Sequence, residues 1–364
     1  SIKRAVAAMG FTQTTPVQQQ VIPAFFQGQD LIVQAPTGTG KTAAFGIPIA
    51  QLTDSRKQGA QALILSPTRE LAIQTAQVLQ KLAQYQKGLR IATLYGGEPI
   101  ARQLSALRAR PQIIVATPGR LIDHIQRRSV SLSAVRIVVL DEADRMLDMG
   151  FQDELNRALA SVPARHQTVL FSATLPGGIL DIAANYQREA KHIIIKQDTL
   201  TVKSVKQFYT TVNQGAKQNE LMSLLKEAKP RLCLVFVNTK RMADTLCNQL
   251  QGQALRADVL HGDIHQVKRE RIMKAFRTGR LDILVATDVA ARGIDVRNID
   301  LVVNFDLPSD SESYVHRIGR TGRAERAGTA HTLIYRREIR KLNAIITDTK
   351  ASIQRMGPSL AAAV

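Results

Sequence analysis

At 364 residues, 45% of them hydrophobic, the chain is too long for one ordinary hydrophobic core and apolar enough to bury two. It has 49 Lys and Arg residues against 30 Asp and Glu, and this net charge of +19 favours a polyanionic partner, nucleic acid first. Two cysteines exclude a disulfide framework, and the lack of an apolar run of about 20 residues excludes a membrane-spanning helix. We therefore expect a monomeric, cytoplasmic protein with no membrane partner.

Short apolar, β-branched runs alternate with helical patterns along the chain, which predicts parallel sheets connected by helices. The predicted strands of the first half span residues 31–34, 62–66, 91–95, 112–116, 137–140, 168–172 and 192–195. A polar stretch interrupts this alternation, and the predicted strands then resume at 208–212, 232–238, 256–260, 282–286, 301–305 and 330–335. We predict an α/β fold with two tandem domains, 1–196 and 207–364, each a mainly parallel sheet flanked by helices, joined by the linker 197–206.

The two halves carry a similar strand end. Residues 113–118, Ile-Ile-Val-Ala-Thr-Pro, resemble residues 283–288, Ile-Leu-Val-Ala-Thr-Asp, which predicts two copies of one α/β unit. Ligands of such sheets bind beyond the carboxyl ends of the strands, where Thr117 and Thr287 fall.

The stretch 35–42, Ala-Pro-Thr-Gly-Thr-Gly-Lys-Thr, follows a predicted strand and opens a predicted helix, as a phosphate-binding loop does. Glycines let the backbone N–H groups turn inward, Lys41 supplies a cation for the outer phosphates, and Thr42 offers a hydroxyl to Mg²⁺. The alternative is a plain glycine-rich turn. The residues assigned to the nucleotide are Thr37, Gly38, Thr39, Gly40, Lys41 and Thr42.

An acidic segment, Asp141-Glu-Ala-Asp144, directly follows the predicted strand 137–140. An acid at a strand end often serves only a turn, but beside a phosphate loop this pair indicates a nucleotide hydrolase. We assign Asp141 to Mg²⁺ and Glu142 to the orientation or deprotonation of the attacking water.

The segment His316-Arg-Ile-Gly-Arg-Thr-Gly-Arg323 places three guanidinium groups within eight residues. A solvated charge run is the simple explanation for an arginine cluster, and we accept it for 336–341. For the segment 316–323 we favour arginine fingers, which stabilise charge on a transferring phosphoryl group. If these fingers lie in the second domain, hydrolysis waits for domain closure.

Together these motifs show that the chain resembles the helicase core of a DEAD-box RNA helicase of superfamily 2 along essentially its whole length. The further motifs that carry the resemblance are Phe11 with Gln18, residues 67–72 (Pro-Thr-Arg-Glu-Leu-Ala), Gly96-Gly97, 117–120, 172–174, 235–238, 266–269 and 286–295. The resemblance implies two RecA-like domains with ATP between them and RNA lying across both.

The resemblance also implies a role for each matching residue. Phe11 should stack on adenine, Gln18 should bind its edge, and Asp295 should reach the ribose. Arg320 and Arg323 should meet the γ-phosphate as arginine fingers. Ser172, Thr174 and His316 are expected to couple nucleotide state to the domain interface. The expected RNA contacts, mostly to phosphate and sugar and so without sequence preference, are Arg69, Gly97, Thr117, Arg120, Arg269 and Thr287.

We therefore predict an ATP-dependent RNA helicase that separates short duplexes locally. One alternative is an RNA clamp that uses ATP to lock onto RNA and seldom unwinds. A second is a DNA-directed superfamily 2 translocase, which Gln18 and the Asp-Glu-Ala-Asp form of the acidic motif argue against.

Overall fold

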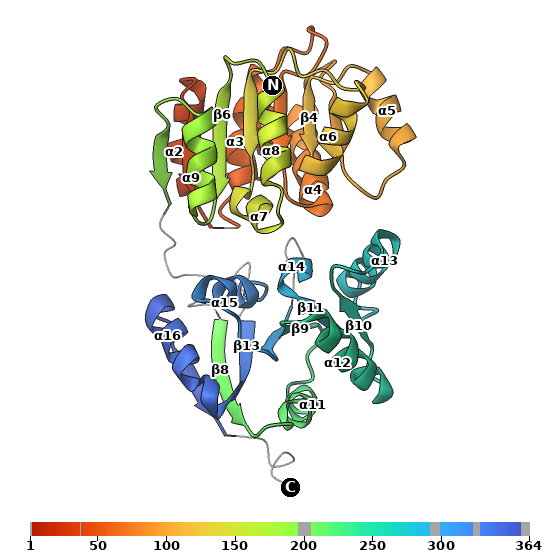
Figure 1. The fold of residues 1–364 in the computed structure, drawn as a ribbon, viewed down its shortest axis with the longest axis vertical. Coiled ribbons are helices and arrows are strands. Elements are labelled where there is room, and N and C mark those ends of the chain that lie inside the picture. Colours follow the sequence, from red (N-terminus) through yellow and green to blue (C-terminus); the bar gives the residue numbers. More distant parts are fainter. Residues whose placement is uncertain (1, 37, 196–204, 292–298, 323–327, 358–364) are drawn as a thin grey trace. The chain divides into compact units, whose positions relative to one another are not determined.

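The computed structural model describes residues 2–36, 38–195, 205–291, 299–322 and 328–357. The chain forms two compact units, Ser1–Gln197 and Asp198–Val364, called unit 1 and unit 2 below. The division falls inside the predicted linker 197–206. Both units are drawn in Figure 1.

Unit 1 is built on a parallel seven-stranded sheet in the order β3-β4-β2-β5-β6-β1-β7. Its strands are β1 (Leu31–Gln34), β2 (Ala62–Leu65), β3 (Ile91–Leu94), β4 (Ile113–Ala116), β5 (Ile137–Leu140), β6 (Gln167–Ser172) and β7 (Lys191–Ile194). The central strands are buried on both faces and read as continuous apolar runs, as expected for a parallel sheet covered by helices.

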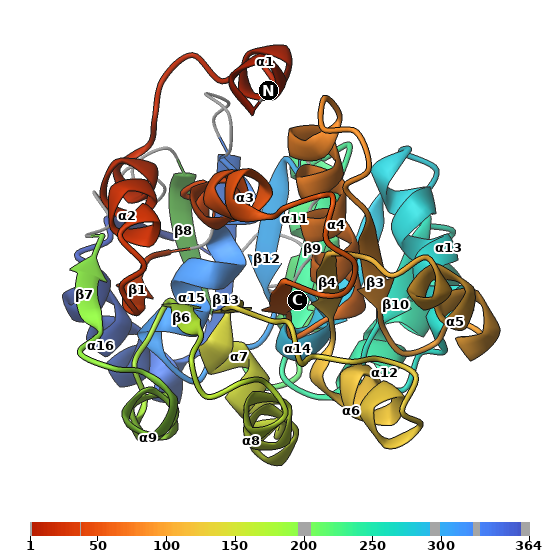
Figure 2. The same cartoon turned by 90° about the horizontal axis from the view of Figure 1, so that it is seen from above.

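Two layers of helices cover this sheet. The helices are α1 (Ile2–Ala8), α2 (Pro16–Phe26), α3 (Lys41–Leu52), α4 (Arg69–Ala83), α5 (Ile100–Arg108), α6 (Pro118–Gln126), α7 (Ala143–Asp148), α8 (Gln152–Ala160) and α9 (Gly177–Tyr186). In Figure 2, α2, α3 and α4 lie on one face of the sheet and α6, α8 and α9 on the other. Side chains alternate along each strand, so Ile64 packs toward the first layer while Leu63 and Leu65 pack toward the second.

Unit 2 repeats the plan with a parallel sheet in the order β10-β11-β9-β12-β13-β8-β14. Its strands are β8 (Val205–Val212), β9 (Cys233–Val237), β10 (Ala257–Leu260), β11 (Ile283–Thr287), β12 (Leu301–Asn304), β13 (Gly328–Tyr335) and β14 (Ile353–Met356). The helical segments are α11 (Lys217–Ala228), α12 (Lys240–Gly252), α13 (Gln266–Arg277), α14 (Asp288–Ala291), α15 (Ser311–Ile318), the 3₁₀ turn η1 (Arg336–Glu338) and α16 (Ile339–Thr349).

The two sheets match position by position, which explains the similar strand ends seen in the sequence. The segment 113–116 forms β4 and the segment 283–287 forms β11, and each is the second strand of its sheet. Thr117 and Thr287 therefore lie at equivalent corners of two units with one topology. The prediction of a mainly parallel α/β fold in both halves is confirmed.

Two strand assignments differ from the sequence prediction. β8 begins at Val205, inside the predicted linker, because Val205 and Gln207 turn into the core while Lys206 stays exposed. β14 was missed because it is a largely exposed edge strand whose residues, Ile-Gln-Arg-Met, lack an apolar pattern. Among the described residues, no helix is long and apolar enough to cross a membrane.

Candidate functional site

The phosphate-loop candidate joins the carboxyl end of β1 to the first turn of α3. Gly40 caps α3 with a φ of 91°, and a Cβ atom there would lie 2.6 Å from Nε2 of Gln18, so the position requires glycine. The buried Lys41 donates from Nζ to the carbonyl oxygen of Ala35 at 3.1 Å, which folds the loop back over the helix N-terminus. The loop thus ends at the N-terminus of a helix, where an anion is favoured. Thr37 lies outside the described residues.

Gln18 ties the start of α2 to this loop. Its Oε1 accepts from the backbone N–H of Thr15 at 3.1 Å, and its Nε2 donates to the carbonyl oxygen of Gly40 at 3.3 Å. The amide is buried in these contacts, whereas the Phe11 side chain is 42% exposed between α1 and α2. Any role of these two residues toward adenine stays a prediction.

Asp141 lies at the carboxyl end of β5, and its carboxyl group is buried. Its backbone N–H donates to the carbonyl oxygen of Leu65, which continues the pairing of β5 with β2 past the strand end. Burial raises the pKa of Asp141 to about 6, while the Lys41 ammonium opposes that rise and the Glu142 carboxylate adds to it. The buried carboxylate of Asp141 thus lies within the electrostatic influence of the phosphate-loop lysine, and its assignment to Mg²⁺ stays a prediction.

Glu142 has an unusual backbone conformation for a residue with a side chain. Its φ and ψ of 53° lie in the left-handed region, and it caps the short helix α7. Its carboxylate forms an ion pair with the guanidinium of Arg145, one turn along that helix. Strained residues of this kind cluster at functional sites, because surrounding contacts must hold them in place.

Asp144, to which the sequence assigned no role, holds the segment that follows β6. Its Oδ2 accepts from the backbone N–H groups of Ala173 and Thr174, both at 3.0 Å, and from the Thr174 hydroxyl at 3.2 Å. Its own N–H donates to the Ser172 hydroxyl at 3.3 Å. Asp144 therefore fixes both expected coupling residues of unit 1 to the acidic segment, Thr174 through its carboxylate and Ser172 through its backbone N–H.

The expected RNA contacts of unit 1 gather at the same edge of the sheet. Arg69 begins α4, with its Cζ 4.5 Å from the ring centre of Tyr95. Gly97 has a φ of 82° in the turn after β3, Thr117 caps α6, and Arg120 donates to the carbonyl oxygen of Glu98 at 3.1 Å. Three loops thus present their polar groups beyond the carboxyl ends of β2, β3 and β4.

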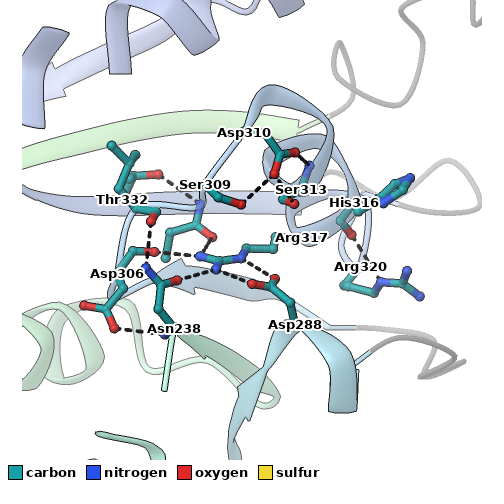
Figure 3. Close-up of polar contacts among 12 residues, drawn as sticks. Asn238, Asp288, Asp306, Ser309, Asp310, Ser313, His316, Arg317, Arg320 and Thr332 are labelled. Carbon is teal, nitrogen blue, oxygen red and sulfur yellow. Dashed lines mark hydrogen bonds and ion pairs between the residues drawn. The ribbon is translucent and has the colours of Figure 1, made fainter. Parts of the chain in front are cut away.

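In unit 2, Arg317 is a buried structural centre and not an exposed finger. Its guanidinium donates to both carboxylate oxygens of Asp288 at 2.6 Å, to Oδ1 of Asn238 at 2.8 Å and to the carbonyl oxygen of Asp306 at 2.6 Å. Figure 3 shows these partners surrounding it, while the Arg320 side chain points away, with its Nε donating to the carbonyl oxygen of His316 at 3.2 Å. His316 and Arg320 line a small hollow beside this network.

The other assigned residues of unit 2 fall partly within the described structure. Arg269 lies in the first turn of α13 and donates to the carbonyl oxygen of Ala290 at 2.7 Å. Thr287 is the last residue of β11 and is buried. Asp295 and Arg323 lie outside the described residues.

Comparison with known proteins relates both units to one class of enzyme. The family model for the DEAD/DEAH box helicase matches residues 15–182, and the model for the helicase conserved C-terminal domain matches residues 216–325. The DEAD-box ATP-dependent RNA helicase CshA of Bacillus subtilis (strain 168) is 47% identical over 355 residues, covering 98% of this chain and 72% of that protein.

Solved structures extend this similarity to the fold. S. cerevisiae Dbp5 bound to RNA and ADP BeF3 has a TM-score of 0.85 at 30% identity, and the match covers 98% of this chain and 93% of that one. Mss116p, with its NTE and C-tail deleted and bound to ssRNA and AMP-PNP, has a TM-score of 0.82 at 29% identity, covering 99% of this chain and 78% of that one.

Proposed function

Because this chain belongs to the DEAD-box family of ATP-dependent RNA helicases, we propose that RNA-stimulated ATP hydrolysis drives local separation of short RNA duplexes through closure of its two units. The family membership makes it an ATP-hydrolysing enzyme that acts on RNA. The division of roles among its residues and the coupling by domain closure are our proposals.

The observation that carries the proposal is the meeting of Lys41 and Asp141 at one edge of the unit 1 sheet. The lysine comes from the loop after β1 and the buried carboxylate from the end of β5, and the Lys41 ammonium opposes the rise in the pKa of Asp141. A nucleotide hydrolase needs a cation for the phosphates and an acid for the metal, and both lie here at the carboxyl edge of a parallel sheet.

The residues present fit a Mg²⁺ ion bound together with ATP. Among the described residues no cluster of three or more His, Cys, Asp or Glu side chains could hold a metal alone, whereas Mg²⁺ is commonly held by one or two carboxylates, waters and substrate phosphates. The raised pKa of the buried Asp141 also means that a cation would stabilise its charged form. Asp141 and Thr42 would hold the ion, which would neutralise charge on the phosphates.

Hydrolysis itself needs an oriented water and a counter-charge for the departing phosphate. We assign the water to Glu142, whose strained backbone and ion pair with Arg145 fix the carboxylate beside Asp141. We assign the counter-charge for the departing phosphate to Arg320 and Arg323 of unit 2, because none of the residues assigned to catalysis in unit 1 is an arginine. Closure of the units would then be a condition for catalysis.

RNA would bind along the edge formed by Arg69, Gly97, Thr117 and Arg120, continued by Arg269 and Thr287 of unit 2. Solved relatives bound to RNA with ADP BeF3, and to ssRNA with AMP-PNP, support this use of the fold. Contacts to phosphate and sugar give affinity without sequence preference and a steep dependence on salt. A cytoplasmic location, which the two free cysteines favour, also stays our proposal.

The decisive experiment measures ATP hydrolysis with no nucleic acid, with single-stranded RNA and with single-stranded DNA, beside unwinding of a short RNA duplex. We expect stimulation by RNA, little by DNA, and unwinding that depends on ATP. Equal stimulation by DNA would favour a translocase, and tight ATP-dependent RNA binding without unwinding would favour a clamp. Lys41→Ala should lose most hydrolysis, and undiminished turnover in that variant would overturn the assignment of the site.

A further inference from the structure

We propose that Gln103 and His124 are positioning residues for RNA binding, because they form a buried bridge that fixes the RNA-contacting segments of unit 1 to one another. The inference rests on the proposed function, since it takes Gly97, Thr117 and Arg120 as RNA contacts. It adds two residues from outside the motifs that identified the family.

Gln103 on α5 is 2% exposed, and its amide is fully used. Nε2 donates to the carbonyl oxygen of Tyr95 at 2.9 Å and to Oε2 of Glu98 at 3.1 Å, so it fastens both ends of the turn that contains Gly97. Oε1 faces Nε2 of His124 at 3.1 Å. The orientation of the amide is determined, because a carbonyl oxygen such as that of Tyr95 can only accept.

His124 connects this turn to α6, the helix that Thr117 caps and that carries Arg120. Since Oε1 of Gln103 is an acceptor, the imidazole carries its proton on Nε2, and Nδ1 lies 2.8 Å from the hydroxyl of Ser129. Burial, aided by Arg120 and Arg127, lowers the pKa of His124, which favours the neutral ring. The ring is fully buried within unit 1.

A second contact joins the same two segments nearer the surface. Arg120 donates to the carbonyl oxygen of Glu98 at 3.1 Å, and the Arg69 guanidinium lies over the ring of Tyr95. Gln103 donates hydrogen bonds to the same two residues, Tyr95 and Glu98. The cluster therefore sets the relative positions of Arg69, Gly97, Thr117 and Arg120, which come from three separate loops.

The alternative explanation is a buried polar pair that only stabilises the core. The two explanations differ in what they expect of RNA. Backbone recognition requires several donors at the spacing of successive phosphates, so a shift of one segment weakens RNA binding without touching the phosphate loop. A purely stabilising pair would change the unfolding midpoint and leave the affinity for RNA unaltered.

Unit 1 supplies a matched control for this test. Gln112 is also 2% exposed, and its amide also joins loops, donating to the carbonyl oxygens of Ser55 at 3.2 Å and Lys57 at 2.9 Å and accepting from the Arg90 N–H at 2.9 Å. It lies at the amino end of β4, away from the edge that carries the expected RNA contacts. Gln112→Leu thus removes the same chemistry from an equally buried site with no link to RNA.

The experiment measures the Kd of a labelled single-stranded RNA in the presence of a non-hydrolysable ATP analogue, together with the KM for ATP and the midpoint of unfolding by urea. Gln103→Leu should raise the RNA Kd about tenfold or more and leave the KM for ATP within about twofold. Gln112→Leu should lower the unfolding midpoint comparably without a change in RNA Kd. Equal RNA affinity in the two variants would overturn the proposal.

Two further variants keep the test informative if Gln103→Leu does not fold. His124→Gln retains a donor for Oε1 of Gln103 and should bind RNA nearly as the parent does, whereas His124→Leu should bind more weakly. Identical RNA affinities for these two would refute a positioning role. A parent protein that binds no RNA would instead contradict the proposed function, so the two failures are distinguishable.

Discussion

Asp144 in unit 1 and Arg317 in unit 2, called the two anchors below, both hold loops together but carry opposite charges. Asp144 accepts three hydrogen bonds from the segment after β6, and Arg317 donates to side chains and a carbonyl oxygen from three segments around β9, β11 and β12. Each is a buried ionic group that ties together loops at the carboxyl edge of its sheet.

The two units differ in the charge of the residues that lie beside each anchor. In unit 1 the anchor is an acid and the residues beside it, Asp141 and Glu142, are acids too, which suits a metal and a water. In unit 2 the anchor is a guanidinium neutralised by Asp288, and the neighbouring Arg320 turns toward a hollow lined by His316. In unit 2 the anchor is thus more buried than the neighbouring Arg320, whereas in unit 1 Asp141 and Glu142 are as buried as Asp144.

The largest expected effect concerns Arg320, the less buried of the two arginines. Arg320→Ala should lower RNA-stimulated ATP hydrolysis about 10³- to 10⁵-fold, roughly 4–7 kcal/mol of barrier, because a γ-phosphate would lose its counter-charge. Its unfolding free energy should stay within about 0.5 kcal/mol of the parent value. Steady-state hydrolysis and urea unfolding measure both quantities, and a large loss of stability would place Arg320 with the anchors.

The variant Arg317→Met tests how much the buried anchor of unit 2 contributes to stability. Removal of the guanidinium leaves Asp288 without its partner, and loss of one member of a buried pair typically costs about 3–5 kcal/mol of unfolding free energy. Urea unfolding of unit 2 measures the effect. Restoration of much of that stability by a second change, Asp288→Leu, would confirm that the unpaired carboxylate is the cause, and no recovery would argue against it.

The sequence predicted the fold positions of those candidate residues that belong to short motifs with a local geometry. Gly40 and Lys41 are adjacent in a strand, loop and helix pattern, and Asp141 directly follows an apolar strand, so their shared edge follows from parallel topology. The anchors could not be predicted in this way. Arg317 lies 29 residues from Asp288 and 79 from Asn238, and only the folded sheet brings these partners together.

The same reasoning explains which parts of the fold were missed. The first residues of β8 and the whole of β14 depend on pairing with a neighbour more than on an apolar pattern, since polar residues such as Gln207 and Gln354 occupy them. Gln103 and Asp144 read as ordinary helical polar residues until their buried partners are known. The roles of all assigned site residues, Phe11, Gln18, Asp295 and Arg323 among them, stay predictions.

Acid should affect the two units in opposite directions. Burial lowers the pKa of His331 from 6.5 to about 4, so the unfolded chain takes up that proton first, and unit 2 loses about 3 kcal/mol of stability as pH falls from about 6.5 to 4. Asp141, whose pKa is raised to about 6, takes up its proton first in the folded state, so unit 1 gains stability as pH falls from about 6 to 4.

Amide hydrogen exchange at pH 7 and pH 5 separates the two responses by following β13 and β6 in the intact chain. Protection of β13 should fall at the lower pH and that of β6 should not. In His331→Asn the loss in β13 should largely disappear, because the side chain no longer titrates. An unchanged pH response in that variant would assign the acid sensitivity of unit 2 to another group.

The smallest expected effect concerns the anchor of unit 1. Asp144→Ala should lower the unfolding free energy by about 1–3 kcal/mol, since it leaves the N–H groups of Ala173 and Thr174 without their acceptor. The loss should be smaller than for Arg317→Met, because these donors are only partly buried and water can replace the carboxylate. If Ser172 and Thr174 couple ATP to RNA, basal hydrolysis should persist in Asp144→Ala while its stimulation by RNA falls. Equal losses of both activities would mean that Asp144 supports the catalytic acids themselves, and the two anchors would then differ in function as well as in charge.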